Sequence, residues 1–128
     1  MPRIMIVDDD PITLKRLRRL VEKKGYRVSS YTSPLGALKQ METACYDLVI
    51  TDVDMPEFNG IDLAEKLIEI KPGIPIVLCT GYSSNSHKQY AKELGIRAYL
   101  SKPILMHELS KTIRNLLDGT SPQNGTDS

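Results

Sequence analysis

The sequence has few cysteines, no tryptophan, little net charge and no long apolar run. Its two cysteines, Cys45 and Cys79, lie far apart and form no C-x-x-C motif, so we expect reduced thiols in a cytoplasmic protein. No stretch of 18 apolar residues occurs, so no membrane span is expected. The 17 basic and 16 acidic side chains leave a net charge of +1, whereas nucleic-acid-binding domains are usually strongly basic. From these features we expect a soluble globular protein that binds neither membranes nor nucleic acids directly.

Short apolar runs recur along the 128 residues, and stretches with helical periodicity separate them. Three of the runs do not alternate polar with apolar residues, which is typical of strands covered on both faces of a parallel sheet. Two weaker candidates follow glycines. The predicted strands cover residues 4–7, 27–31, 48–51, 76–79 and 98–101.

Each predicted strand is followed by a predicted helix. The helices are expected around Leu14, Leu17 and Val21, over residues 34–43 with Ser33 as the N-cap, around Leu63, Leu67 and Ile70, over residues 83–94, and around Leu109, Ile113 and Leu116. Five strand–helix units favour an α/β fold, with helices on both faces of a five-stranded parallel sheet. Residues 1–117 are therefore predicted to form one domain. Residues 118–128 have no large apolar side chain and are predicted to be a disordered tail or linker.

Polar side chains follow the predicted strands, at the edge where open parallel sheets bind ligands. They are Asp8 and Asp9 after the first strand, Asp52 and Asp54 after the third, Thr80 after the fourth and Lys102 after the fifth. Two like charges about 4 Å apart repel by roughly 4 kcal/mol at an effective dielectric constant near 20, so converging carboxylates require a proton or a cation. Donor sets made only of oxygen favour a hard ion such as Mg²⁺. An aspartate can also be a nucleophile, so the pattern suits a phosphoryl group on or near Asp52.

A simpler interpretation exists for each of these residues alone. Asp8, Asp9 and Asp10 could cap the following helix, and a single threonine or lysine at a strand end means little. The joint occurrence of acids, hydroxyl and lysine at the exits of four strands favours a site.

Four motifs make the chain resemble a response-regulator receiver domain, in the chemotaxis-regulator-like superfamily of two-component signalling. The motifs are MIVDDD at residues 5–10, DLVITDVDMPEFNG at 47–60, IVLCTG at 76–81 and AYLSKP at 98–103. The resemblance spans nearly everything but the tail. It implies a flavodoxin-like, doubly wound (βα)5 fold with strand order 2-1-3-4-5. It also implies a cis peptide bond before Pro103.

The resemblance implies a role for each site residue. Asp52 would accept the phosphoryl group. Mg²⁺, or Mn²⁺ as a substitute, would bind Asp8, Asp9, Asp52 and the main-chain carbonyl of Asp54. Thr80 and Lys102 would bind phosphoryl oxygens. Thr80 and Tyr99 would form the switch, and Asp54 and Tyr82 would tune the lifetime of the phosphorylated state.

The resemblance also implies the partners. A histidine kinase or phosphotransfer protein would donate the phosphoryl group in a phosphorelay, and the chain would lose it slowly rather than act as a turnover enzyme. Phosphorylation would change the surface of the fourth helix, fifth strand and fifth helix. This surface would control an output domain or effector, and it is also the candidate surface for a homodimer. That surface is expected to include Lys88, Ala91, Tyr99 and Met106.

Three alternatives stay open on the sequence. Asp52 and Asp54 resemble the paired aspartates of haloacid-dehalogenase-like phosphatases, although that motif normally ends the first strand. A flavin- or nucleotide-binding module could share the topology, but it would need a phosphate cradle where this chain has three aspartates. The third alternative is a pseudo-receiver that only binds partners.

Overall fold

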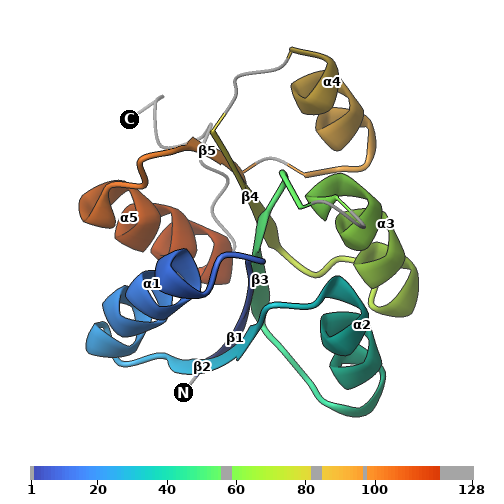
Figure 1. The fold of residues 1–128 in the computed structure, drawn as a ribbon. Coiled ribbons are helices and arrows are strands. Elements are labelled where there is room, and N and C mark those ends of the chain that lie inside the picture. Colours follow the sequence, from blue (N-terminus) through green and yellow to red (C-terminus); the bar gives the residue numbers. More distant parts are fainter. Residues whose placement is uncertain (1, 56–58, 82–84, 97, 119–128) are drawn as a thin grey trace.

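In the computed structural model, five strands and five helices alternate along the described part of the chain (Figure 1). The structure describes residues 2–55, 59–81, 85–96 and 98–118, and the side chains of residues 85–88 are not part of that description. The elements are β1 (Arg3–Val7), α1 (Pro11–Lys23), β2 (Arg27–Tyr31), α2 (Pro34–Thr43), β3 (Leu48–Asp52), α3 (Gly60–Ile70), β4 (Ile76–Thr80), α4 (Asn85–Glu93), β5 (Ala98–Ser101) and α5 (Met106–Leu117).

The five strands form one parallel sheet in the order β2-β1-β3-β4-β5, which confirms the predicted fold. Strand β1 lies between β2 and β3, with Val7 opposite Thr51. The residues that follow, Asp8 and Asp52, therefore emerge side by side at one edge of the sheet. The peptide bond between Lys102 and Pro103 is cis, as the resemblance implies.

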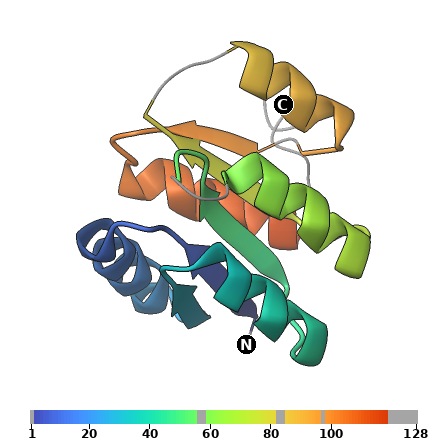
Figure 2. The ribbon, with the colours of Figure 1, turned by 45° about the vertical axis from the view of Figure 1, so that its right-hand side comes forward.

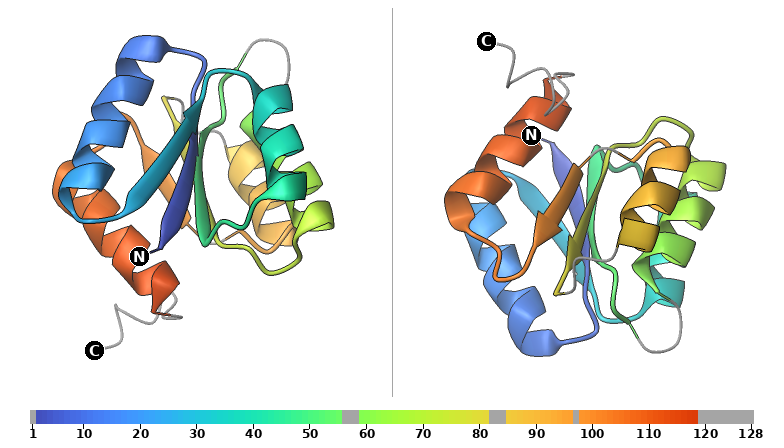
Figure 3. Two further views of the ribbon diagram at one scale, coloured as in Figure 1. Left: turned by 90° about the horizontal axis from the view of Figure 1, so that it is seen from below. Right: turned by 90° about the horizontal axis from the view of Figure 1, so that it is seen from above.

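The sheet separates two hydrophobic layers because successive residues of each strand point to opposite faces. Ile4 and Ile6 of β1 contribute to the layer under α1 and α5, and Met5 and Val7 contribute to the layer under α2, α3 and α4. Figures 1 and 2 show α1 and α5 on one face of the sheet and α2, α3 and α4 on the other, and Figure 3 shows the same division from below and from above. With both faces covered, strands β3 and β4 are buried throughout.

Some expectations about individual residues were wrong. Ala91, expected on the switch surface, is buried at 1% exposure, because it packs into the core layer under α2, α3 and α4. Ile70, expected in the buried stripe of α3, is 37% exposed because the helix ends there. Strands β3 and β4 each continue one residue further than predicted, so Asp52 and Thr80 belong to the strands themselves.

Other expectations fall on residues outside the description. The predicted start of the fourth helix at residue 83 lies there, as do Tyr82 and the tail from residue 119. Within the described part of the chain, no helix has the length and apolar character needed to cross a membrane.

Candidate functional site

Three consecutive aspartates, Asp8 to Asp10, follow strand β1, and they differ in burial and in hydrogen bonding. Asp8 is buried at 1% exposure, and one of its oxygens, Oδ1, accepts a hydrogen bond from the backbone N–H of Asp10 at 2.9 Å. Asp10 is the N-cap of α1, because its carboxylate accepts from the N–H of Ile12 at 3.2 Å and the hydroxyl of Thr13 at 2.6 Å. Asp9 is exposed. The helix cap is thus supplied by Asp10, and neither Asp8 nor Asp9 makes the capping bonds of this helix.

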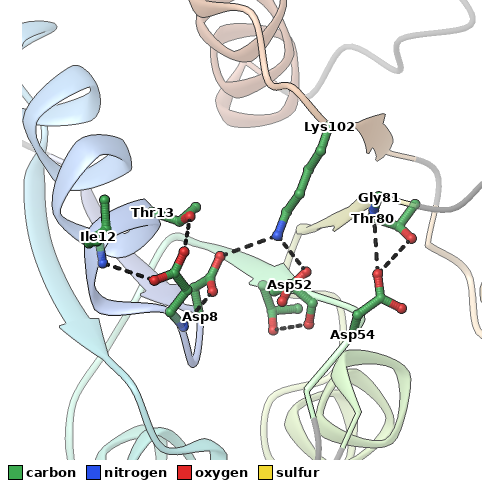
Figure 4. A network of polar contacts seen from close by, with 10 residues as sticks. Asp8, Ile12, Thr13, Asp52, Asp54, Thr80, Gly81 and Lys102 are labelled. Atoms are coloured by element: carbon green, nitrogen blue, oxygen red, sulfur yellow. Dashed lines mark hydrogen bonds and ion pairs between the residues drawn. The ribbon is translucent and has the colours of Figure 1, made fainter.

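Asp52 ends β3 beside Asp8, and Lys102 reaches both carboxylates from the end of β5 (Figure 4). The Lys102 Nζ lies 3.0 Å from Oδ1 of Asp52 and 3.6 Å from Oδ2 of Asp8. Asp52 is only 4% exposed. One lysine therefore serves as the counter-charge for two buried acids.

The electrostatics follow from this burial. Burial raises the pKa of Asp52 and of Asp8, and the charge of Lys102 offsets the rise only in part. Burial lowers the pKa of Lys102, but contact with Asp52 and the charge of Asp8 outweigh it and raise the pKa overall. The site has more negative than positive charge and favours a further cation.

The carboxylates of Asp8, Asp9 and Asp52 fit a divalent ion. Each can offer one oxygen, and these three oxygens lie within 4.8 Å of one another. All the donors are hard oxygen atoms, without cysteine or histidine, which suits Mg²⁺ or Mn²⁺. Three acids with one lysine between two of them also leave a charge that such an ion would neutralise.

Strand β4 contributes a hydroxyl at the same edge. Thr80 is fully buried, and its backbone carbonyl accepts a hydrogen bond from the N–H of Lys102 at 2.8 Å, which ties the ends of β4 and β5 together. The Thr80 hydroxyl donates to Oδ2 of Asp54 at 3.1 Å, and the N–H of Gly81 donates to the same oxygen at 3.3 Å. Asp54 itself is exposed to solvent.

Of the predicted site residues, the structure brings together Asp8, Asp9, Asp52, Asp54, Thr80 and Lys102, whereas Tyr82 lies outside the described residues. Tyr99 lies half-buried on β5 against the core layer under α2, α3 and α4, and burial raises the pKa of its hydroxyl. No sequence pattern predicted that the Asp54 side chain would turn toward Thr80 and Gly81. No periodic signal reaches Asp54, because it follows the end of the strand.

Gly60 allows α3 to begin close to the acid site. In the sequence it appeared only as the last residue of the motif at 47–60. A Cβ atom at Gly60 would lie 2.0 Å from the carbonyl oxygen of Asp52 and 2.9 Å from Cα of Val53. The Gly60 N–H also donates to the carbonyl of Val53 at 2.9 Å. The start of α3 can approach the end of β3 this closely only because residue 60 has no side chain.

Comparison with known proteins gives a consistent result. A family model described as the response regulator receiver domain matches residues 4–114. The TorCAD operon transcriptional regulatory protein TorR of Escherichia coli (strain K12) is 34% identical over 114 residues, which cover 89% of this chain and 49% of TorR. Response regulator MprA of Mycobacterium sp. (strain KMS) is 34% identical over 126 residues, 98% of this chain and 55% of MprA. The chain spans about half the length of these curated relatives.

Solved structures resemble the fold over nearly the whole chain. A CheY-like response regulator receiver domain protein from Methanospirillum hungatei JF-1 has a TM-score of 0.89 at 30% identity, covering 93% of this chain and 95% of that one. Chemotaxis protein CheY4 of Vibrio cholerae has a TM-score of 0.85 at 26% identity, covering 90% of this chain and 98% of that one.

Proposed function

Because the chain belongs to the response regulator receiver domain family, we propose that Asp52 accepts a phosphoryl group from the phosphohistidine of a histidine kinase or phosphotransfer protein. The observation that carries the proposal is the setting of Asp52. Its carboxylate is buried at a strand end, 3.0 Å from the Lys102 ammonium and within reach of the Asp8 and Asp9 oxygens.

In the transfer step, a carboxylate oxygen of Asp52 attacks phosphorus as the P–N bond of the phosphohistidine breaks. The electron pair of that bond returns to the imidazole, which takes up a proton. Lys102 lies where its charge stabilises negative charge on the transferring group. Mg²⁺ held by Asp8, Asp9 and Asp52 would supply further neutralisation when bound.

The product carries about two negative charges where Asp52 had one. Thr80 is suited to respond to this change in charge, because its hydroxyl lies at the site and its carbonyl accepts a hydrogen bond from the N–H of Lys102, directly after β5. We place the switch at Thr80 and Tyr99, and the output on the surface of α4, β5 and α5, which would bind an effector, an output domain or a second copy of the chain. The chain would be labelled once and lose phosphate slowly, without turnover.

Two alternatives remain to be separated from the receiver: a cofactor-binding module and a phosphatase. A nucleotide or flavin phosphate at the start of α1 would meet Asp8, Asp9 and Asp10, which would repel it. A phosphatase of the haloacid-dehalogenase type would hydrolyse a generic phosphate ester with multiple turnovers. Absence of such turnover, and of a bound chromophore in the purified protein, separates the receiver from both.

The direct test of the site is titration with Mg²⁺ and fluoroberyllate, a phosphoryl mimic, followed by residue-resolved NMR. We expect Mg²⁺-dependent shifts first at Asp8, Asp52 and Lys102, and then at Thr80 and Tyr99 as fluoroberyllate binds. The Asp52→Asn variant should lose the response to fluoroberyllate. Binding that is independent of Mg²⁺, or that survives this substitution, would overturn the assignment.

A further inference from the structure

One side chain at the site makes contacts that phosphoryl transfer to Asp52 does not require. Oδ2 of Asp54 accepts hydrogen bonds from the Thr80 hydroxyl at 3.1 Å and from the Gly81 N–H at 3.3 Å. Figure 4 shows the Asp54 carboxylate turned toward β4, while Lys102 lies on the other side against Asp52 and Asp8. The hydrogen-bond donors of the site are therefore divided between two groups of carboxylates.

The two donors on Asp54 form a binding arrangement for an anionic oxygen. A hydroxyl and a backbone N–H converge on a single oxygen atom, which is how proteins commonly hold a phosphoryl or carboxylate oxygen. Hydrogen bonds to charged acceptors are also stronger than neutral ones. In the resting protein, a carboxylate of the chain itself occupies this arrangement.

We infer that Asp54 is an internal ligand of Thr80 and Gly81, and that its carboxylate must leave them before they can bind an oxygen of the phosphoryl group on Asp52. The inference rests on the proposed function and makes Asp54 a positioning residue. It holds the switch threonine in the resting arrangement and lowers the fraction of molecules ready to bind the phosphoryl group.

The charge and exposure of Asp54 agree with release on phosphorylation. Asp54 follows Asp52 by two residues, and two carboxylates of like charge at one site repel each other. A phosphoryl group would increase that repulsion, because it carries about two charges. Asp54 is exposed, so its carboxylate can turn into water without leaving a buried charge behind.

The consequence is measurable as an affinity. A protein whose binding-competent state is only partly populated binds more weakly by that fraction. If Asp54 occupies Thr80 and Gly81 in about nine molecules of ten, removing its carboxylate tightens fluoroberyllate binding about tenfold. The Asp54→Asn variant keeps an acceptor oxygen but loses the charge, so we expect it to fall between wild type and Asp54→Ala.

The experiment has two readouts on wild type, Asp54→Ala and Asp54→Asn. The first is the Gly81 amide proton signal without Mg²⁺ or fluoroberyllate, which reports the resting contact by itself. The second is the dissociation constant of fluoroberyllate at saturating Mg²⁺. Asp62→Asn is the matched control, because it removes another exposed acid that lies in the first turn of α3.

We expect Asp54→Ala to move the Gly81 amide proton upfield in the resting state and to tighten fluoroberyllate binding about tenfold, with Asp62→Asn unchanged in both. An unmoved Gly81 signal, or an affinity that is equal or weaker in Asp54→Ala, would overturn the inference. If wild type bound no fluoroberyllate at all, the proposed function would fail. The resting spectra would then still show whether the Asp54 contact exists.

Discussion

At the scale of single residues, the charge of Lys102 governs the acid site. Its ammonium is the counter-charge of Asp52 and Asp8. Because both carboxylates are buried, removing this one cation costs more free energy of unfolding than removing one partner of an exposed ion pair.

Replacing Lys102 by methionine keeps most of the apolar stem and removes the charge. Asp52 and Asp8 then face each other without a counter-charge, and we expect the free energy of unfolding at neutral pH to fall by about 2 kcal/mol. Urea unfolding without divalent ions measures this loss. Mg²⁺ should bind the variant more tightly than wild type, because a competing cation is gone, and should restore part of the stability.

The control is Lys66→Met, which removes an exposed charge on α3 and should change stability by less than about 0.5 kcal/mol. Equal stability of the Lys102 and Lys66 variants would show that Lys102 does not neutralise the buried acids.

Two glycines near the site make a matched pair for a second substitution. Gly60→Ala would place Cβ 2.0 Å from the carbonyl oxygen of Asp52, so the end of β3 must move. At Gly81 the added Cβ has no contact within 4 Å among the described residues outside its chain neighbours. We expect Gly60→Ala to cost about 1–3 kcal/mol in urea unfolding and to weaken fluoroberyllate binding, and Gly81→Ala to leave stability nearly unchanged. Equal stability of the two variants would contradict the close approach of α3 to β3.

Residue identity predicted which groups gather at the site, but not how each is oriented. Asp8, Asp52 and Lys102 could be assigned because each follows a strand whose end faces one edge. Asp54 could not, because its hydrogen bonds join residues 26 and 27 positions apart in a loop without periodicity. In the structure, the Asp54 carboxylate contacts the Thr80 hydroxyl although the residue is exposed.

At the scale of elements, different aspartates before α1 have different roles, one in helix capping and another in the proposed ion binding. The first helical residue is Pro11, and the N-cap bonds come from Asp10. Of the acids that precede α1, Asp10 thus has a structural role that the neighbouring Asp9 does not share.

We therefore expect opposite effects from two neighbouring substitutions. Asp10→Ala should lower the midpoint of thermal unfolding by several degrees through loss of the cap, with Mg²⁺ affinity changed little. Asp9→Ala should weaken Mg²⁺ binding at least severalfold and leave the midpoint nearly unchanged. Calorimetry and Mg²⁺ titration measure both quantities. If Asp10→Ala instead abolished Mg²⁺ binding, the division of roles would be wrong.

The elements themselves were largely readable from the sequence. Apolar runs marked β1, β3 and β4, because burial on both faces of the sheet requires them, and helical stripes marked α1, α3 and α5. The weaker strands β2 and β5 were predicted after glycines. Helix α4 was the least readable. Its sequence, NSHKQYAKE, has few apolar residues, and this is where the position of Ala91 was misjudged.

At the scale of the whole molecule, the proposed switch depends on how β4 and β5 are joined. Thr80 is paired with Ser101, and its carbonyl is bonded to the N–H of Lys102. In the proposed switch, a displacement of Thr80 would thereby be transmitted to β5, whose Tyr99 lies two residues before Ser101. Ile74 and Ile96 precede β4 and β5, at the end of the sheet opposite to Thr80 and Lys102.

We expect saturation with fluoroberyllate and Mg²⁺ to shift the amide signals of Tyr99 and Ser101 strongly and those of Ile74 and Ile96 little. Sedimentation of the same samples tests whether the changed surface forms a homodimer. Shifts spread evenly over both ends of the sheet would contradict transmission through β4 and β5.

The global topology could be obtained only in part from residue patterns. Periodicity indicates a parallel sheet with helices on both faces, but it carries no information on which strands are neighbours. The order β2-β1-β3-β4-β5 came from the resemblance, and the structure confirms it. That order brings Asp8 and Asp52 together, so the site depends on a property that no local pattern encodes.

The central claim is that Asp52 is the phosphoryl acceptor. Its most direct test is labelling of the protein with acetyl phosphate and Mg²⁺, with the modified residue located by mass spectrometry. We expect one phosphoryl group per chain, on Asp52, in wild type and in the control Asp62→Asn, and none in Asp52→Asn or after chelation of Mg²⁺. Undiminished labelling of Asp52→Asn, or a label found on another residue of the wild type, would contradict the claim.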